Sequence, residues 1–278
     1  MENTLKPVIT SASISASSKR KNEDAAAHFV LKDSYHIAVA DGVGSASHAK
    51  EASEFVTKKY QHLCKKQPSS AKNIYTEINR LLSEQFTHSE DGYETTLITL
   101  QQNLSEGFHI NYVGNGCIFH LKGNFWQQKT SSQIPWNITN YLAPHSLLEN
   151  GKEVLYNYFS NHNQQALLPT SLQVSADPYF GDIFILGTDG FHSEDQKKAG
   201  KNKSGTWEKF PEILLIFFEG LSTFFTENEV LNKAQLQLWL EKFLNSQQKK
   251  QLLEDDTSIA ILISGTALKF HQKHKEPH

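Results

Sequence analysis

The hydrophobic pattern near the N-terminus predicts three strands. Residues 9–15 (ITSASIS) alternate between apolar and polar positions, as in a strand with one buried face. Residues 27–31 (AHFVL) and 35–40 (YHIAVA) are apolar runs separated by the turn-forming KDS. These last two runs predict an antiparallel hairpin.

Two amphipathic helices are expected next. Apolar residues after His48 recur at the spacing of one helix face, at Ala49, Ala52, Phe55, Val56, Tyr60 and Leu63. After Pro68 a second stripe comprises Ile74, Ile78, Leu81, Leu82 and Phe86. Each stripe predicts a helix that packs one face on a core.

The middle of the chain is rich in short β-type runs. They are separated by Gly and Asn turn signals and occupy residues 93–101, 107–114, 117–123 and 124–128. We expect them to form a meander of antiparallel strands. Residues 129–178 are polar and irregular and predict no element, whereas residues 182–190 (DIFILGTDG) begin as an apolar strand.

Two helices are predicted in the C-terminal third. The first extends from Trp207 to Phe225, and its longest apolar run, ILLIFF, is far shorter than the roughly 20 residues of a membrane span. Thr226 followed by Glu229 is a capping-box pattern that predicts the start of another helix. The apolar positions of that helix are Val230, Ala234, Leu238 and Leu240.

The chain closes with a strand predicted at residues 255–264 (DDTSIAILIS) and a polar stretch, 266–278, that we expect to be a flexible tail. Strands at both ends of the chain enclose two helical blocks, without a clear linker between them. We therefore predict one α+β domain, residues 1–265, that is built on antiparallel sheets and contains a variable region at residues 127–178.

Composition excludes some classes of function. The 278 residues include 27 basic and 30 acidic side chains, and a formal net charge of −3 does not favour nucleic acid or an anionic membrane as a partner. An early acid and the lack of an apolar segment near the N-terminus argue against a signal peptide. Cys64 and Cys117 are too few for a disulfide framework, so we expect two buried thiols and a cytoplasmic location.

The candidate chemistry lies in acidic residues at strand ends. Asp-Gly is first of all a turn dipeptide, and Asp91-Gly92 follows a polar segment, so we interpret it as a plain turn. Asp41-Gly42 and Asp189-Gly190 instead follow the apolar segments IAVA and IFILGT. These two aspartates are therefore expected at the C-terminal ends of central strands.

Two further acidic pairs flank predicted strands, Asp255-Asp256 and Glu23-Asp24. If the four strand ends converge, repulsion and desolvation would raise the pKa of these carboxyls unless a cation neutralised them. Oxygen ligands without nearby Cys or paired His favour Mg²⁺ or Mn²⁺ over zinc or copper. Four unrelated surface turns are the alternative interpretation.

Six motifs in this order resemble the metal-dependent Ser/Thr protein phosphatases of type 2C, and especially their bacterial branch. They are KRKNEDA, VADGVGS, ETTLITL, INYVGNG, GDIFILGTDG and DDTSIAILI. The resemblance extends over about residues 8–265 and is poor at 127–178, which includes the place of the family's mobile flap. It implies a four-layer αββα sandwich, in which helices flank two antiparallel β-sheets and a two-metal centre lies at one end.

The resemblance also implies roles for single residues in catalysis and metal binding. Asp41 would bridge two Mn²⁺ or Mg²⁺ ions, and Gly42 would offer its backbone carbonyl. Asp189 and Asp255 would complete the shell of the first ion. Two such ions about 3.5–4 Å apart lower the pKa of a bridging water and shield the phosphate, so hydroxide can attack phosphorus in line.

Glu23 and Asp24 would hold the second ion directly or through water. Lys19 stands where the family usually has a phosphate-binding arginine, and Arg20 is next to it. Either would clamp the phosphoryl oxygens, although lysine lacks the bidentate fork of arginine. A solvated basic turn is the alternative interpretation of this KRK segment.

The sequence departs from the family at a third, weaker metal site. Asn115 replaces the aspartate of the family's GDS motif, and Ser193 replaces a second acid. Since an asparagine contributes an oxygen without charge, a third ion is expected to bind weakly or not at all. Val43 also stands where eukaryotic members have a histidine; a water or His48 would have to donate the proton, although His48 is more simply a first-turn helix residue.

Two other functions compete with this prediction. A nucleotide-binding module would use Gly42-Val43-Gly44, but Ser47 replaces the third glycine and the preceding strand belongs to a hairpin. A non-catalytic pseudophosphatase that binds phosphoproteins is the stronger rival. We predict an active, monomeric, cytoplasmic phosphatase that acts on phosphoserine and phosphothreonine in proteins and opposes a Ser/Thr kinase, because a metal-free scaffold has no physical need for five converging carboxylates.

Overall fold

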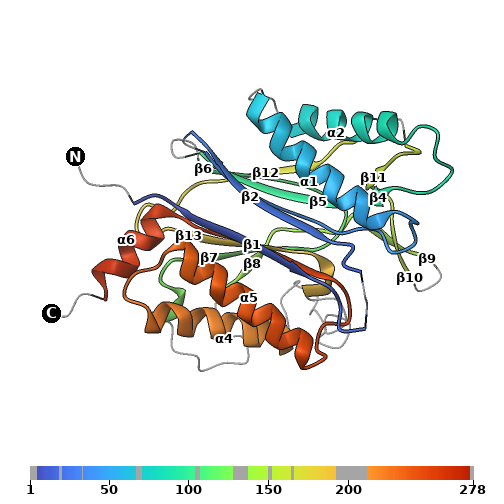
Figure 1. The fold of residues 1–278 in the computed structure, drawn as a ribbon. Coiled ribbons are helices and arrows are strands. Elements are labelled where there is room, and N and C mark those ends of the chain that lie inside the picture. The colour runs from blue at the N-terminus through green and yellow to red at the C-terminus, as the bar shows by residue number, and fades with distance from the viewer. Residues whose placement is uncertain are drawn as a thin grey trace.

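Two five-stranded sheets form the centre of the molecule, and helices cover their outer faces (Figure 1). The computed structural model describes residues 5–18, 21–32, 34–66, 71–103, 107–127, 137–149, 152–163, 166–191 and 212–275. All strand pairs in both sheets are antiparallel. The predicted αββα sandwich is therefore confirmed.

Each sheet combines strands from distant parts of the chain. The first has the order β1 (Val8–Ile14), β14 (Thr257–Ile263), β13 (Asp182–Gly187), β7 (Cys117–Lys122) and β8 (Thr139–Asn140). The second has the order β12 (Thr170–Val174), β6 (Gly107–Val113), β5 (Leu97–Asn103), β3 (Ser34–Ala40) and β2 (Ala25–Leu31). Two small ribbons pair β9 (Ser146–Glu149) with β10 (Lys152–Leu155), and β4 (Glu94–Thr95) with β11 (Phe159–Ser160).

Alternating side chains of the central strands fill three apolar layers. Ile37 and Val39 of β3 point between the two sheets, whereas Ala38 and Ala40 belong to the cluster beneath the helices on that side. Because successive side chains of a strand point to opposite faces, one apolar strand contributes to two layers at once. This explains why IAVA is apolar at every position.

Helices complete the outer layers. On the second sheet lie α1 (Ala49–Lys66) and α2 (Ala71–Gln85), and on the first lie α4 (Glu212–Glu227) and α5 (Lys233–Lys249). The predicted helices are confirmed where the structure describes them, and residues 207–211 of the helix expected from Trp207 lie outside the described residues. The run ILLIFF lies in α4, with Phe217 and Phe218 fully buried. None of the described helices is long and apolar enough to cross a membrane. Cys64 and Cys117 are both free thiols, of which Cys64 is only partly buried.

The predicted meander is wrong after its second strand. β5 and β6 pair, but β7 pairs with β13 in the opposite sheet. The chain crosses between the sheets at Gly114 and Gly116, whose φ angles of +101° and +124° favour glycine. The irregular region 129–178 also differs from expectation, because its described residues form β8 to β12.

The start of α5 is a second correction. Thr226 lies inside α4, where its hydroxyl donates to the Ser222 carbonyl at 2.8 Å, and Asn232 caps α5 by accepting a hydrogen bond from the Gln235 amide. Burial of Phe225 extends α4 past the expected boundary, so packing overrides the local capping pattern. Leu238, placed on the apolar face, is 52% exposed.

Part of the expected C-terminal tail is ordered. Residues Gly265–Lys273 form α6, and Ser264 caps this helix by accepting a hydrogen bond from the Ala267 amide. Leu268 and His271 are buried against the first sheet's outer layer. The prediction of a tail from residue 266 was wrong for this part, because the few buried positions of α6 suffice to dock a short helix.

One buried histidine makes stability depend on pH. His36 of β3 is 2% exposed, stacks on Phe29 at 4.6 Å and lies 3.1 Å from the Tyr60 hydroxyl. Burial lowers its pKa from 6.5 to about 4. As the pH falls, the unfolded chain protonates at this position before the folded chain does. The neutral His36 therefore contributes its full share to the free energy of unfolding above pH 6.5, and this share is lost as the pH falls toward 4.

We expect the free energy of unfolding to fall by up to about 3 kcal/mol as the pH is lowered from 6.5 to 4, because of His36. Urea unfolding at pH 7 and pH 5 measures it. His36→Gln should flatten the pH dependence, whereas His88→Gln, at an exposed position, should keep the wild-type slope. An unchanged slope in His36→Gln would contradict the assignment.

Candidate active site

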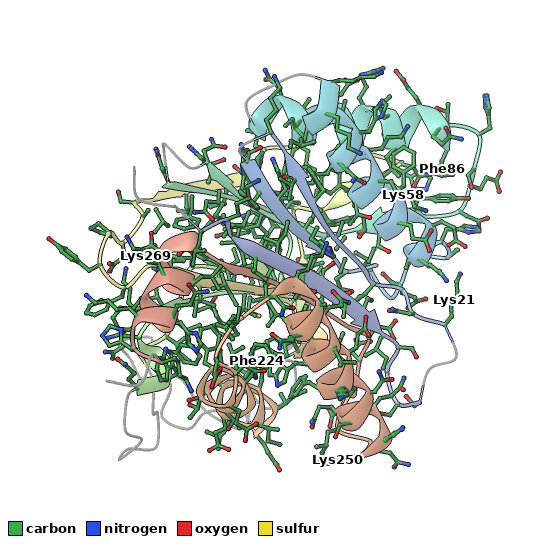
Figure 2. The ribbon with its side chains drawn as sticks, turned by 60° about the vertical axis from the view of Figure 1, so that its left-hand side comes forward. Lys21, Lys58, Phe86, Phe224, Lys250 and Lys269 are labelled. Atoms are coloured by element: carbon green, nitrogen blue, oxygen red, sulfur yellow. The ribbon has the colours of Figure 1, made fainter. Side chains whose placement is uncertain are left out.

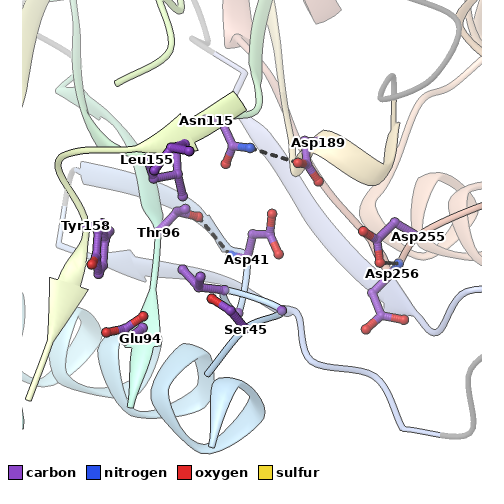
Figure 3. Close-up of a pocket in the computed structure, with 14 residues that line it drawn as sticks. Asp41, Ser45, Glu94, Thr96, Asn115, Leu155, Tyr158, Asp189, Asp255 and Asp256 are labelled. Carbon is purple, nitrogen blue, oxygen red and sulfur yellow. Dashed lines mark hydrogen bonds between the residues drawn. The ribbon is translucent and has the colours of Figure 1, made fainter. Parts of the chain in front are cut away.

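A polar pocket of about 400 Å³ lies at one end of the sandwich. The predicted residues Asp41, Gly42, Asp189 and Asp255 all line it. Figure 3 shows Asp41 between one wall that carries the other aspartates and an opposite wall that carries Tyr158. The convergence of three of the four acidic strand ends is therefore observed directly.

Sheet register brings these ends together. Ala25 of β2 pairs with Ala40 of β3, which places Asp24 and Asp41 side by side at the open end of the hairpin. In the facing sheet Gly187, the last residue of β13, pairs with Ile259 near the start of β14. Asp189 therefore lies close to Asp255 and Asp256, which directly precede β14.

The backbone around Asp41 is fixed by two threonines. The Asp41 carbonyl accepts hydrogen bonds from the Thr95 hydroxyl at 2.7 Å and the Thr96 amide at 2.8 Å. The Asp41 amide donates to the Thr96 hydroxyl at 3.0 Å. At Gly42 a Cβ atom would lie 2.8 Å from the Ala49 Cβ, so only glycine lets α1 start this close.

Asp24 and Asp41 are acidic groups whose burial, together with the charges of neighbouring acids, disfavours the charged form of each. Burial raises the pKa of Asp24 to about 8, although the Thr188 hydroxyl donates to its Oδ2 at 2.6 Å. Burial, followed by the charges of Asp189 and Asp24, holds the pKa of Asp41 well above its usual range. Asp41 also makes side-chain contacts of hydrogen-bond type with both acids. Such contacts between carboxylates require a proton or a cation.

Asp256 is a residue whose role the sequence did not reveal. Its Oδ1 accepts the Ala16 amide and its Oδ2 accepts the Glu23 amide, both at 2.7 Å. Asp256 therefore holds the segment that leads into Asp24. Glu23 itself is not among the residues that line the pocket, and its carbonyl accepts the Ser53 hydroxyl at 2.6 Å.

Other predicted residues lie elsewhere. Lys19, Arg20 and Ser193 are outside the described residues. His48 does not line the pocket; its ring stacks on Tyr93 at 4.5 Å and contacts the carboxylate of Asp91, which is 59% exposed. The position of Asp91 in an exposed loop agrees with the plain turn expected for Asp91-Gly92.

Asn115 is hydrogen-bonded to Asp189 at the edge of the pocket. Its Nδ2 donates to the Asp189 Oδ2 at 2.7 Å, while its own Oδ1 is buried and has no donor among the described residues. His145 holds this loop: its Nδ1 accepts the Gly114 amide, its backbone amide donates to the Gly114 carbonyl, and its Nε2 lies 2.8 Å from the Thr170 hydroxyl. A single histidine has no sequence pattern that would predict its contact with a distant loop.

The donor set suits a hard divalent cation. Among the described residues, no three His, Cys, Asp or Glu side chains already form a group that could hold a metal. Yet the pocket supplies carboxylate and carbonyl oxygens, and Asp24 Oδ1 is buried without a hydrogen-bond donor in the described part of the chain. Mg²⁺ and Mn²⁺ prefer such oxygens, and their charge would remove the conflict around Asp41.

Comparisons with known proteins identify a family and similar folds. A family model described as protein phosphatase 2C matches residues 15–251. The Mycobacterium tuberculosis serine/threonine phosphatase PstP/Ppp is 13% identical, with a TM-score of 0.60 over 94% of this chain and 99% of that chain. The catalytic domain of PstP in complex with two manganese ions is 15% identical, with a TM-score of 0.57 over 94% and 99%.

RsbX in complex with magnesium is 16% identical, with a TM-score of 0.54 over 95% of this chain and 98% of that chain. At such identities the likeness shows the fold. A search of curated proteins finds no match.

Proposed function

Because this chain belongs to the protein phosphatase 2C family, we propose that it is a metal-dependent phosphatase that hydrolyses phosphoserine and phosphothreonine in proteins. One observation carries the proposal: Asp41, Asp189 and Asp255 line one pocket, and Asp41 contacts both Asp189 and the buried Asp24, so their charges require compensation. The specificity for phosphoproteins rests on the family alone.

We assign the cation ligands as follows. Asp41 would be shared by two Mn²⁺ or Mg²⁺ ions, with the Gly42 carbonyl beside it; Asp189 and Asp255 would serve one ion, and Glu23 and Asp24 the other. When bound, the ions would supply positive charge to the phosphate and acidify the attacking water. The carboxylates would also exclude a phosphate from the pocket until that charge is present.

The chain itself preorganises this site. Thr95 and Thr96 hold the Asp41 backbone, and Asn115 orients Asp189, so the donors need little rearrangement. Glu94 and Tyr158 line the opposite wall, where they would contact the substrate beside its phosphate. Lys19 or Arg20 would bind the phosphoryl oxygens.

A pseudophosphatase remains the second candidate, and the neutral Asn115 favours it. Its amide already satisfies one oxygen of Asp189 without adding a ligand charge. The opposing kinase, the cytoplasmic location, the monomeric state and the absence of nucleic-acid or membrane partners stay predictions.

Hydrolysis of p-nitrophenyl phosphate and a phosphothreonine peptide tests the proposal, with a Mn²⁺ titration, with EDTA and in Asp189→Ala. We expect metal-dependent turnover that falls roughly 10²-fold or more in the variant, because an electrostatic ligand is lost. Asp91→Ala is the matched control, since it alters an Asp-Gly acid outside the pocket. If calorimetry showed Mn²⁺ binding but no turnover were detected, the proposal of an active enzyme would be overturned and the pseudophosphatase would be supported.

A further inference from the structure

We propose that a second pocket, on the outer face of the α1–α2 layer, binds an acidic segment of the phosphoprotein substrate. This inference rests on the proposed function. The pocket has a volume of about 460 Å³ and is lined by Phe55, Lys58, Lys59, His62, Gln85 and Phe86. Figure 2 shows Lys58 and Phe86 near one another on this side of the molecule.

The pocket combines an aromatic surface with positive charge. Phe55 and Phe86 meet edge to face at 5.7 Å, and the Lys59 Nζ lies 5.0 Å from the centre of the Phe55 ring. Lys58 contacts Glu54 at 2.8 Å, but its side chain is 73% exposed. Exposed pairs of this kind contribute only about 0–1 kcal/mol, so Lys58 can exchange Glu54 for a carboxylate of a ligand.

Basic residues dominate the second half of α1. They are Lys58, Lys59, His62, Lys65 and Lys66. Basic residues in the last turn complement the helix dipole, which accounts for Lys65 and Lys66. Lys58 and Lys59 lie about two turns earlier, where the dipole effect has faded, and both line the pocket.

Aromatic rings extend from this pocket toward the active site. His48 stacks on Tyr93 at 4.5 Å, and Tyr93 stacks on Phe86 at 3.8 Å. His48 directly precedes α1 and follows the Gly42–Ser45 loop, which lines the active-site pocket. The seven residues from His48 to Phe55 span only about 10 Å of helix, which about three extended substrate residues cover. The three residues from Ser45 to His48 add at most about 10 Å, so up to about six extended substrate residues would reach from one pocket to the other.

An acidic peptide is the ligand that fits best. Carboxylates would pair with Lys58 and Lys59, and an apolar residue between them would cover Phe55 and Phe86. A nucleic acid is less suited, because the pocket offers few cations for a phosphate backbone and the chain as a whole carries a net charge of −3.

Two phosphothreonine peptides test this docking. Each carries three glutamates and a leucine about six residues from the phosphothreonine, on its N-terminal side in one peptide and on its C-terminal side in the other. The reference peptide has serines in place of the glutamates. We expect wild type to prefer an acidic peptide about tenfold in kcat/KM through a lower KM, and the preference to weaken with salt. Lys58→Glu/Lys59→Glu should abolish it while p-nitrophenyl phosphate turnover stays unchanged.

The matched control is Lys249→Glu/Lys250→Glu, which reverses two charges at the end of α5 on the opposite layer (Figure 2). Fluorescence anisotropy with the unphosphorylated acidic peptide measures docking without turnover, so failure of the enzyme and failure of the docking site are distinguishable. Equal losses in both double variants, tighter binding of a single-stranded oligonucleotide than of the peptide, or no preference in wild type would overturn the proposal.

Discussion

Replacing Asp41 with asparagine is expected to stabilise the metal-free protein and to abolish its turnover. Asp41 contacts Asp24 and Asp189, and burial together with their charges raises its pKa well above the usual range. Removing one charge from this group should raise the free energy of unfolding in EDTA by about 1–2 kcal/mol, or the Tm by about 3–6 °C.

The sign of the pH dependence follows from the raised pKa. A folded-state pKa above the unfolded value means that folded protein keeps a proton which the unfolded chain releases, so metal-free wild type loses stability as the pH rises from about 4. For Asp24 this loss continues to about pH 8. The advantage of Asp41→Asn over wild type should therefore grow from pH 5 to pH 8.

Bound Mn²⁺ should reverse the order, because binding to the folded state stabilises wild type more than a variant that lacks the shared ligand. Thermal unfolding at both pH values, with EDTA and with Mn²⁺, measures this. Asp91→Asn provides the control, since that carboxylate is exposed outside the pocket. Lower stability of Asp41→Asn in EDTA at pH 8 would contradict the electrostatic account.

Replacing Asn115 with aspartate is expected to have the opposite effect. The change turns the donor to Asp189 into an acceptor and places two carboxylates at 2.7 Å contact. Without metal the protein should lose about 1–2 kcal/mol of unfolding free energy, since the partly buried carboxylate of Asp189 loses one donor and gains a like charge. With Mn²⁺ the added charge should strengthen binding of a further ion about tenfold, which corresponds to about 1.4 kcal/mol.

Native mass spectrometry and calorimetry would count the ions, and activity at limiting Mn²⁺ would show whether the further ion aids turnover. Asn115→Ala separates loss of the donor from gain of charge: it should destabilise without raising metal affinity. Unchanged stoichiometry and unchanged stability in Asn115→Asp would show that Asn115 does not stand in for a cation.

Much of the fold was predictable because its signals are local. Residues 35–40 are apolar at almost every position, which requires a strand buried on both faces, and the structure places β3 in the middle of a sandwich. The stripes of α1 and α2 have the period of a helix, and their helices were predicted correctly. Acidic residues at the ends of such strands indicated Asp41, Asp189 and Asp255 as site candidates, and all three line one pocket.

Tertiary structure alone decided which strands meet. Burial patterns repeat every second residue whichever partner lies beside the strand, so they do not reveal that β1 pairs with β14, or that β7 leaves its neighbours for the opposite sheet. The edge strand β12 alternates partly exposed and exposed residues, and its sequence was therefore too polar to predict. Pairing between distant segments depends on the whole core rather than on either segment.

The same distinction holds for the site. The sequence by itself determined which carboxylates lie at strand ends and which family the chain resembles, because both features depend only on residues that are close together in the sequence. Only the folded chain decided that Asp256 braces the segment before Asp24, that His145 holds the Asn115 loop, and that α1 and α2 form a basic aromatic pocket. Each of these contacts joins residues far apart in sequence, and its energy exists only after the sheets and helices have packed.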